Sequence, residues 1–152
     1  MSTSKWRALW FIAFFALLVF LRTRTPHHPA APSLVAWVPI AEAQQRATSS
    51  SKPIFYKFST EWCGPYGGLD DEVFHNEPLA ARINLKLVPV HIVDRMREDG
   101  RNPEDVEALL QRFDVRAFPT MVVVDANGTT LARLEGFGGR DRFEEEMNRF
   151  LQ

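Results

Sequence analysis

The 152-residue chain has only one cysteine, Cys63. A single cysteine excludes a disulfide within the chain and a zinc site built from several cysteines. The fold must therefore be held by packing. The composition is 45% hydrophobic, which suffices for one domain with its own core once the apolar N-terminus is set aside.

An excess of charge is also missing. The 18 basic and 19 acidic residues give a net charge of −1, which argues against binding to nucleic acid or to an acidic substrate. The sequence has no internal repeat, no phosphate-binding glycine loop and no hydrolase nucleophile elbow. The surroundings of Cys63 are therefore the main functional signal.

The longest apolar run is residues 8–21, which has basic residues on both sides. It predicts a membrane anchor or signal segment over residues 1–24, although about 17–25 apolar residues are usual for a full span. Basic residues after the run oppose cleavage, so we expect an uncleaved signal anchor, with a cleaved signal peptide as the alternative. The rest of the chain is then expected in the periplasm, on the outer side of a bacterial inner membrane.

Residues 25–33 contain three prolines and predict an extended linker. A single globular domain is expected over residues 34–152. Hydrophobic periodicity and the positions of proline and glycine predict its elements. They are helix 39–48, strand 54–58, loop 59–64, helix 65–75, helix 79–84, strand 85–93, surface loop 94–101, helix 102–113, strands 120–125 and 129–135, and helix 140–151.

Two of these boundaries have specific local signals. Asn102 and Pro103 are expected to be the N-cap and the first-turn proline of a helix. Ala126-Asn127-Gly128 is typical of a tight hairpin, because asparagine and glycine tolerate positive φ. The order of elements predicts an α/β fold, in which helices flank one mixed central sheet.

Cys63 lies between a predicted strand and a predicted helix. Backbone N–H groups at the start of a helix stabilise negative charge and lower the pKa of a thiol, and the thiolate is the form that attacks disulfides. A lone cysteine is more often a small buried hydrophobe. The position at a helix start, together with the Gly-Pro that follows, favours a reactive thiol here.

The segment Glu61-Trp62-Cys63-Gly64-Pro65 resembles the active-site segment of the thioredoxin family. Phe118-Pro119-Thr120 is similar to that family's cis-proline loop, and Phe113-Asp114-Val115-Arg116 leads into it as in the family. The glycines of residues 136–139 also fit. The resemblance covers the whole predicted domain and implies a thioredoxin-like fold. Asp71-Glu72-Val73-Phe74 makes the chain similar to periplasmic or membrane-anchored thioredoxin-like reductases.

The resemblance implies that Cys63 attacks a substrate disulfide and that a second cysteine releases the product. Tyr66 stands in the position of that second cysteine and cannot attack a mixed disulfide. Its hydroxyl either donates a hydrogen bond to the thiolate or is a packing substitution. Lys57 stands where many thioredoxins have a buried acid. It either favours the Cys63 thiolate by its charge or snorkels from a strand edge.

The resemblance also implies where a substrate binds. A cis Pro119 presents the backbone of Phe118 to an extended chain, whereas a trans proline in a surface loop is the alternative. Trp62 and Phe118 are expected to form an exposed apolar rim around the thiol. Gly64, Pro65 and Tyr66 complete the motif.

Metal ions and cofactors are not expected. His75 and His91 have no histidine or carboxylate at metal-ligand spacing and are interpreted as ordinary histidines. Asp70, Asp71 and Glu72 are interpreted as acids that favour the helix dipole.

The sequence thus favours a monothiol that exchanges disulfides through Cys63. Its expected partners are extracytoplasmic proteins or low-molecular-weight thiols, one of which supplies the resolving thiol. The alternative is a redox-inactive thioredoxin-fold module that binds peptides or envelope proteins. Dithiol reduction with a cysteine lent by a partner chain is a third interpretation.

Overall fold

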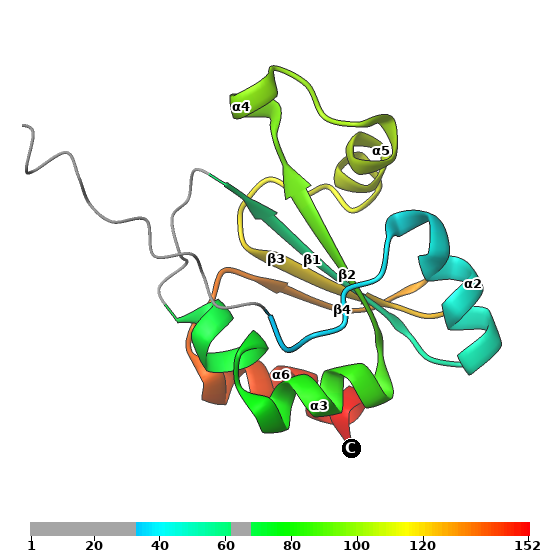
Figure 1. Cartoon of the computed structure of the whole chain (residues 1–152), viewed down its shortest axis with the longest axis vertical. Coiled ribbons are helices and arrows are strands. Elements are labelled where there is room, and N and C mark those ends of the chain that lie inside the picture. Colours follow the sequence, from blue (N-terminus) through cyan, green and yellow to red (C-terminus); the bar gives the residue numbers. More distant parts are fainter. Residues whose placement is uncertain (1–32, 62–67) are drawn as a thin grey trace, which may run out of the picture. The chain divides into compact units, whose positions relative to one another are not determined.

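The computed structural model describes residues 33–61 and 68–152. Within them, four strands form one mixed sheet in the order β2-β1-β3-β4 (Figure 1). β1 is parallel to β2, and β3 is antiparallel to both β1 and β4. The predicted α/β architecture with a mixed central sheet is confirmed. The strands are β1 (Ile54–Thr60), β2 (Val88–Asp94), β3 (Thr120–Val124) and β4 (Thr130–Glu135).

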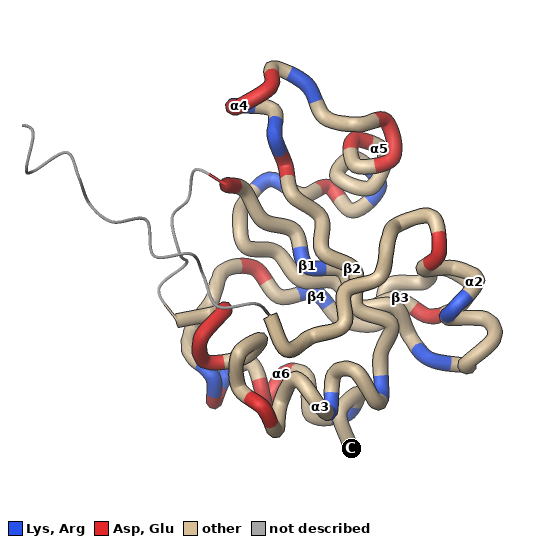
Figure 2. Tube along the Cα trace, in the orientation of Figure 1, with Lys and Arg blue, Asp and Glu red and all other residues tan. Residues whose placement is uncertain are grey.

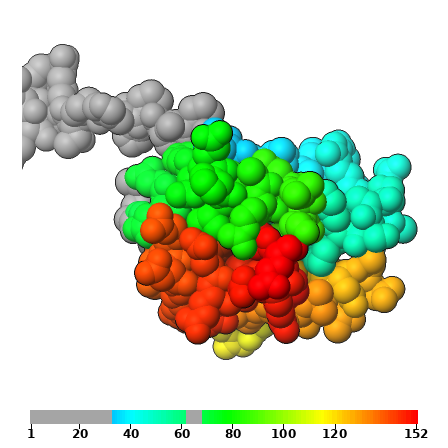
Figure 3. Space-filling model, turned by 90° about the horizontal axis from the view of Figure 1, so that it is seen from below, coloured from blue at the N-terminus to red at the C-terminus, as the bar shows by residue number. Residues whose placement is uncertain are grey.

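Helices cover both faces of this sheet. η1, a single π-helical turn, packs with α3 and α6 on one face, and α2 and α5 pack on the other. α3 and α6 lie side by side (Figures 1 and 3). The helices are α2 (Ile40–Ser50), η1 (Asp70–Phe74), α3 (Glu77–Lys86), α4 (Met96–Asp99), α5 (Glu104–Arg112) and α6 (Arg140–Leu151).

The predictions for the N-terminal residues concern a part of the chain that the structure does not describe. The predicted anchor, residues 1–24, and the predicted linker up to residue 32 lie outside the described residues. Among the helices described above, none has the length and apolar content that a membrane span requires.

The central strand β1 contributes to two cores, because successive side chains of a strand point to opposite faces. Phe55 packs with η1, α3 and α6, whereas Tyr56 and Phe58 pack with α2 and α5. All seven residues of β1 are buried. This is expected for a strand with neighbours on both sides and helices on both faces.

Local sequence signals explain several element ends. The side chain of Asn76 accepts a hydrogen bond from the N–H of Leu79 and caps α3. The predicted hairpin between β3 and β4 is confirmed, and Gly128 has a φ of 82° in its turn. The predicted helix 140–151 is confirmed as α6, with Phe143 and Met147 buried on its inner face.

Some predicted strand boundaries are wrong by a few residues. Ser59 and Thr60 belong to β1 and not to a loop, because they continue the pairing with β2. β2 begins only at Val88, because α3 extends through Lys86. Of the apolar residues before Val88, Leu85 therefore lies in α3 and is exposed, whereas the buried Leu87 follows the helix in an extended conformation. Of the predicted helix 65–75, the described part is the π-helical turn η1.

The predicted surface loop 94–101 contains the short helix α4. Asn102 is not the N-cap of the helix that follows, because Pro103 takes that position. The Asn102 amide instead donates to Asp94 (2.8 Å) and Glu107 (3.2 Å). Its oxygen accepts from the N–H of Arg95. The side chain of Asn102, which the sequence predicts to cap a helix, thus stabilises the connection between β2 and α5 instead.

Candidate functional site

The last residues of β1 and β2 and the first residue of β3 lie together at one end of the sheet. Thr60 at the end of β1 is paired with Asp94 at the end of β2, and Phe58 is paired with Thr120 at the start of β3. After β1 the described chain stops at Glu61 and resumes at Gly68. Figure 2 shows acidic residues where the described chain stops and where it resumes.

The predicted redox motif belongs to the segment between Glu61 and Gly68. Trp62, Cys63, Gly64, Pro65 and Tyr66 lie outside the described residues. The other predicted site residues, Lys57, Phe118 and Pro119, lie within them.

Lys57 lies in the central strand, and its residue surface is only 4% exposed. It forms an ion pair with the carboxylate of Asp70 at the start of η1. The Lys57 ammonium is 4.6 Å from the ring centroid of Phe74 and 5.9 Å from that of Trp37, and aromatic rings attract a cation. The interpretation that Lys57 snorkels from a strand edge is wrong, because β1 has β2 and β3 on its two sides.

This ion pair connects the two elements that flank the Cys63 segment. Lys57 belongs to the strand before it and Asp70 to the helical turn after it. The prediction that Asp70 serves the helix dipole missed this role, because its partner lies 13 residues earlier in the chain. The ion pair thus joins both ends of the connection that carries the motif.

Ser59 and His91 lie beside this pair. His91 is opposite Lys57 in the pairing of β1 with β2, and its Nε2 is 2.7 Å from the Ser59 hydroxyl oxygen. Burial, and secondarily the charge of Lys57, lower the pKa of His91 to about 4. His91 is therefore neutral at neutral pH. We call Lys57, Asp70, His91 and Ser59 the Lys57 cluster.

The Phe118–Pro119 peptide bond is cis, as the resemblance implies. The Thr120 hydroxyl donates to the carbonyl of Ala117 (2.7 Å), and the N–H of Gly136 donates to the carbonyl of Pro119 (2.8 Å). Phe118 is half-buried and packs against the core on the α2 and α5 side. It therefore offers less exposed surface to a rim around the thiol than the sequence predicted.

Arg133 of β4 supports the chain that leads into this loop. Its guanidinium donates to the carbonyls of Phe113 and Asp114 after α5 and forms an ion pair with Glu135 at 2.7 Å. Carbonyls at the end of a helix are favourable partners for a cation. Sequence reasoning missed Arg133, because its partners lie about 20 residues earlier and no local pattern marks them.

Glu61 precedes the motif directly and forms an ion pair with Arg95. Arg95 also forms an ion pair with Asp99 of α4 at 2.6 Å. The hydrogen bond to Asp99, together with the charges of Asp99 and Glu61, raises the pKa of Arg95. The turn after β2 thus holds the last described residue before the motif. This contact joins residues 34 positions apart, so no local sequence pattern indicates it.

A family model described as a thioredoxin-like domain matches residues 40–151, which include every helix and strand described above. The chain belongs to this family. The disulfide bond reductase DsbH of Chlamydia pneumoniae is 26% identical to this thioredoxin-like domain over 109 residues, which are 70% of this chain and 66% of that protein. A chorismate synthase of Carboxydothermus hydrogenoformans is 32% identical over 87 residues, which are 55% of this chain.

The chain matches just under two thirds of the length of the first relative and 23% of the second. A solved DsbH oxidoreductase structure is similar to the thioredoxin-like domain with a TM-score of 0.66 at 23% identity. The similarity covers 84% of this chain and 92% of that one. At this identity it shows the shared fold.

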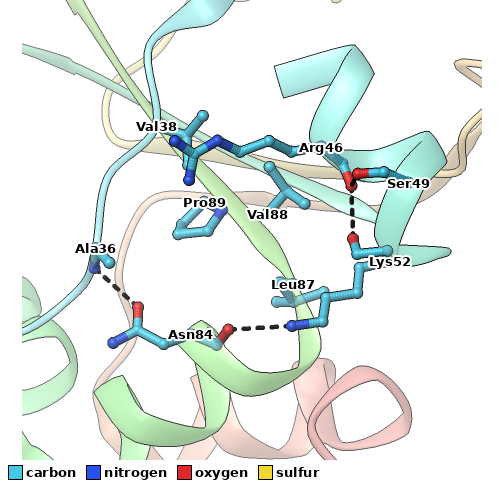
Figure 4. A pocket seen from close by; sticks show the side chains of 10 residues that line it. Ala36, Val38, Arg46, Ser49, Lys52, Asn84, Leu87, Val88 and Pro89 are labelled. Carbon is cyan, nitrogen blue, oxygen red and sulfur yellow. Dashed lines mark hydrogen bonds between the residues drawn. The ribbon is translucent and has the colours of Figure 1, made fainter. Parts of the chain in front are cut away.

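The thioredoxin-like domain also has a groove at the other end of the sheet, where β2 begins (Figure 4). It has a volume of about 320 Å³, and its polar lining comes from Arg46, Lys52, Asn84 and the two serines Ser49 and Ser50. Arg46 forms an ion pair with Glu42 at 2.7 Å, and the Lys52 ammonium donates to the carbonyl of Asn84 at 3.4 Å. Both cations of the groove are thus already bound within the domain.

The two histidines of the described domain, His75 and His91, have different partners. His75 does have a carboxylate partner, contrary to the prediction, because its Nδ1 is 3.1 Å from Asp71. Within residues 33–61 and 68–152, no group of three or more His, Cys, Asp or Glu side chains could hold a metal ion.

Proposed function

We propose that this thioredoxin-like protein exchanges disulfides through Cys63 and requires an outside thiol to complete the reaction. The observation that supports this most directly is the register of β1 and β3. Phe58 is paired with Thr120, so the Pro119 loop lies at the end of the sheet where β1 leads toward Cys63. A polypeptide bound at the loop would therefore lie near the chain that carries the thiol.

The first half of the reaction requires only Cys63. Its thiolate attacks a substrate disulfide, one substrate sulfur leaves as a thiolate, and the other becomes bonded to Cys63 in a mixed disulfide. Tyr66 cannot break the new bond, because a phenol is not a thiol. A low-molecular-weight thiol or a cysteine of another protein must attack in its place. Similarity to a disulfide bond reductase supports this chemistry.

Trapping of mixed disulfides in cells tests the proposal. Cys63 is the chain's one cysteine, so Cys63→Ser is a complete control for thiol chemistry. Cells are quenched in acid, free thiols are alkylated, and species disulfide-linked to the chain are identified by mass spectrometry. We expect linked proteins or small thiols for the wild type and none for Cys63→Ser. Recovery of Cys63 only as the free thiol would contradict the proposal.

A redox-inactive binding module is the second candidate. It is favoured by Tyr66, which removes the self-contained cycle of a two-cysteine protein. For such a module, Cys63→Ser should retain partner binding and phenotype, whereas Phe118→Ala should weaken both. Loss of phenotype in Cys63→Ser at normal protein level rejects it.

We further propose that residues 8–21 anchor the chain in a bacterial inner membrane and that the domain faces the periplasm. Protease treatment of spheroplasts tests both parts. The domain should be digested without detergent and should sediment with membranes before digestion. Protection of the domain in intact spheroplasts would contradict the periplasmic orientation.

A further inference from the structure

We propose that Arg133 is a positioning residue for the Pro119 loop and that it favours reaction with polypeptide disulfides over small ones. This inference rests on the proposed function, because it concerns which disulfides react with Cys63. Arg133 acts through the backbone of residues 113–119, which connect α5 to β3 and include the Pro119 loop.

Arg133 lies on the face of β4 that is turned toward the end of α5. It is paired with Val122 of β3, and residues directly opposite in an antiparallel pair have side chains on the same face. Val122 belongs to the core on the α2 and α5 side. The Arg133 side chain is 31% exposed, so most of it is covered. The strand register thus directs the guanidinium toward the chain that follows α5.

The guanidinium of Arg133 has two sets of partners. Its Nε and Nη2 donate to Oε1 of Glu135, at 2.9 and 2.7 Å. Its Nη1 donates to the carbonyl of Phe113, and its Nη2 donates to the carbonyl of Asp114 at 3.2 Å. The donors of a guanidinium are held in one plane. The bonds to Glu135 therefore orient the group toward the two carbonyls.

The two carbonyls lie where the hydrogen bonds of α5 have ended. The N–H of Asp114 donates to the carbonyl of Gln111 (3.1 Å), and the N–H of Val115 donates to that of Leu110 (2.9 Å), which closes the helix. Asp114 has a φ of 46°, in the left-handed region that residues with a side chain disfavour. A cation is favourable at the end of a helix. Arg133 thus stabilises a backbone conformation that costs free energy by itself.

This attachment determines how the chain enters the Pro119 loop. The ring of Phe113 packs in the core on the α2 and α5 side, so both its side chain and its carbonyl are fixed. The later part of the loop is bound through the carbonyls of Ala117 and Pro119. Loss of the Arg133 hydrogen bonds should therefore loosen the approach to Phe118 while the later attachments remain.

Only some disulfides depend on this loop. A polypeptide that pairs in extended form with the backbone at Phe118 gains main-chain hydrogen bonds when that backbone is in place. A bound group that is displaced by about 1 Å can react on the order of 100-fold more slowly. A small disulfide without peptide groups gains no such hydrogen bonds. The position of the loop should therefore affect the reaction with polypeptides and not with small disulfides.

Both kinds of disulfide react by the same chemical step. The Cys63 thiolate attacks one sulfur, the substrate disulfide breaks, and the other sulfur leaves with the electron pair as a thiolate. One disulfide replaces another, so the step needs no further oxidant or reductant. A change in the ratio of the two rates therefore reports on substrate binding, whereas an equal change in both rates reports on the reactivity of Cys63.

The test compares the two rates on the full chain. The reduced protein is mixed with insulin, a polypeptide with disulfides, or with dipyridyl disulfide, which has no peptide groups. Disulfide formation at Cys63 is followed by mass spectrometry after quenching in acid. The variants are Arg133→Met, Arg133→Lys and, as the matched control, Arg149→Met. Arg149 also donates to a backbone carbonyl, that of Leu131 in β4, but not to the connection 113–119.

We expect Arg133→Met to react about tenfold more slowly with insulin and at the wild-type rate with dipyridyl disulfide. Arg133→Lys keeps the charge but has a single donor nitrogen, so it should recover part of the rate with insulin. Arg149→Met should leave both rates unchanged, although it also removes a hydrogen bond to β4. A merely structural role of Arg133 would not change the ratio of the two rates.

The outcomes separate this inference from the proposed function. The same ratio of rates in the wild type and in a folded Arg133→Met variant overturns the inference and leaves the proposed function standing. Equal slowing with both disulfides also overturns it, because Arg133 would then act on the thiol. If Arg133→Met does not fold, Arg133→Lys decides: a lower rate with insulin alone supports the inference, and an unchanged ratio overturns it.

A wild type that reacts with neither disulfide would contradict the proposed function. Amide hydrogen exchange then tests the positioning role of Arg133 without thiol chemistry. Faster exchange at Ala117 and Phe118 in Arg133→Met, with β3 unchanged, supports the attachment of the loop by Arg133. Unchanged exchange at these two amides overturns it.

Discussion

The two faces of the central strand are both buried, but they differ in chemistry toward the end that leads to Cys63. On the face covered by α2 and α5, Tyr56 and Phe58 continue an aromatic core. On the face covered by η1, α3 and α6, Phe55 is followed by Lys57 and Ser59. Buried charged and polar groups stabilise a fold less reliably than apolar groups of similar size. β1 therefore buries less apolar surface on the face where Lys57 forms its ion pair with Asp70.

The apolar face and the polar face of β1 should therefore contribute differently to the stability of the domain. The aromatic face should determine most of the free energy of unfolding, and the Lys57 cluster should determine how that free energy responds to pH and to loss of charge. Substitutions on each face can break the distinction or sharpen it.

The largest loss of stability is expected on the aromatic face. Phe58 is fully buried, so Phe58→Ala should lower the free energy of unfolding by about 3–5 kcal/mol, because it removes buried apolar surface and leaves a cavity. Urea denaturation measures the change. Leu85→Ala is the control, because Leu85 is 63% exposed, and it should cost less than about 0.5 kcal/mol. Similar losses for the two variants would contradict the assignment of stability to this core.

A smaller, pH-dependent effect is expected from His91. Its pKa is about 4 in the folded protein against an ordinary value of 6.5 for histidine, so the unfolded chain binds more protons between these two values. The stability that His91 contributes is present above pH 6.5 and is lost as the pH falls toward 4. The loss is up to about 3 kcal/mol.

His91→Gln tests this dependence. The variant should show a weaker decline of stability between pH 6.5 and 4 than the wild type, measured by urea denaturation in matched buffers. An unchanged decline would show that His91 is not the group responsible.

Substitution of Asp70 and substitution of Lys57, the two members of the ion pair, should lower the free energy of unfolding by different amounts. Asp70→Asn leaves the Lys57 ammonium buried without its counter-charge. Because Asp70 is partly exposed, the cost is reduced by screening to about 1–2 kcal/mol. Lys57→Met removes the buried charge itself and should cost less, about 1 kcal/mol or below. Thermal and urea unfolding of the two variants decide the order, and a larger loss for Lys57→Met would reverse the interpretation.

An effect as small as that of Lys57→Met is expected at the Pro119 loop. Thr120 is fully buried, and its hydroxyl donates to the carbonyl of Ala117. Thr120→Val keeps the shape and removes this hydrogen bond, so it should cost about 1 kcal/mol. Thr120→Ser, which retains the hydroxyl, is the matched comparison by urea denaturation. Equal stability of the wild type and Thr120→Val would show that the bond does not hold the loop.

Much of the fold could be predicted because its signals are local. The stripe of α6, the Asn-Gly turn and the apolar run of β1 each depend on neighbouring residues. The errors arise where distant contacts decide. α3 extends through Lys86 into the predicted strand, and Asn102 bonds to Asp94 across a turn instead of capping a helix.

By itself, the sequence determined the family resemblance, the single thiol and the missing second cysteine. Those properties depend on which residues occupy a short motif. Only the tertiary structure decided that Lys57 is central and paired with Asp70, that Arg95 holds Glu61, and that Arg133 supports the chain before Pro119. The physical reason is that an ion pair or a hydrogen bond depends on distance in space, and folding sets that distance between residues far apart in the chain.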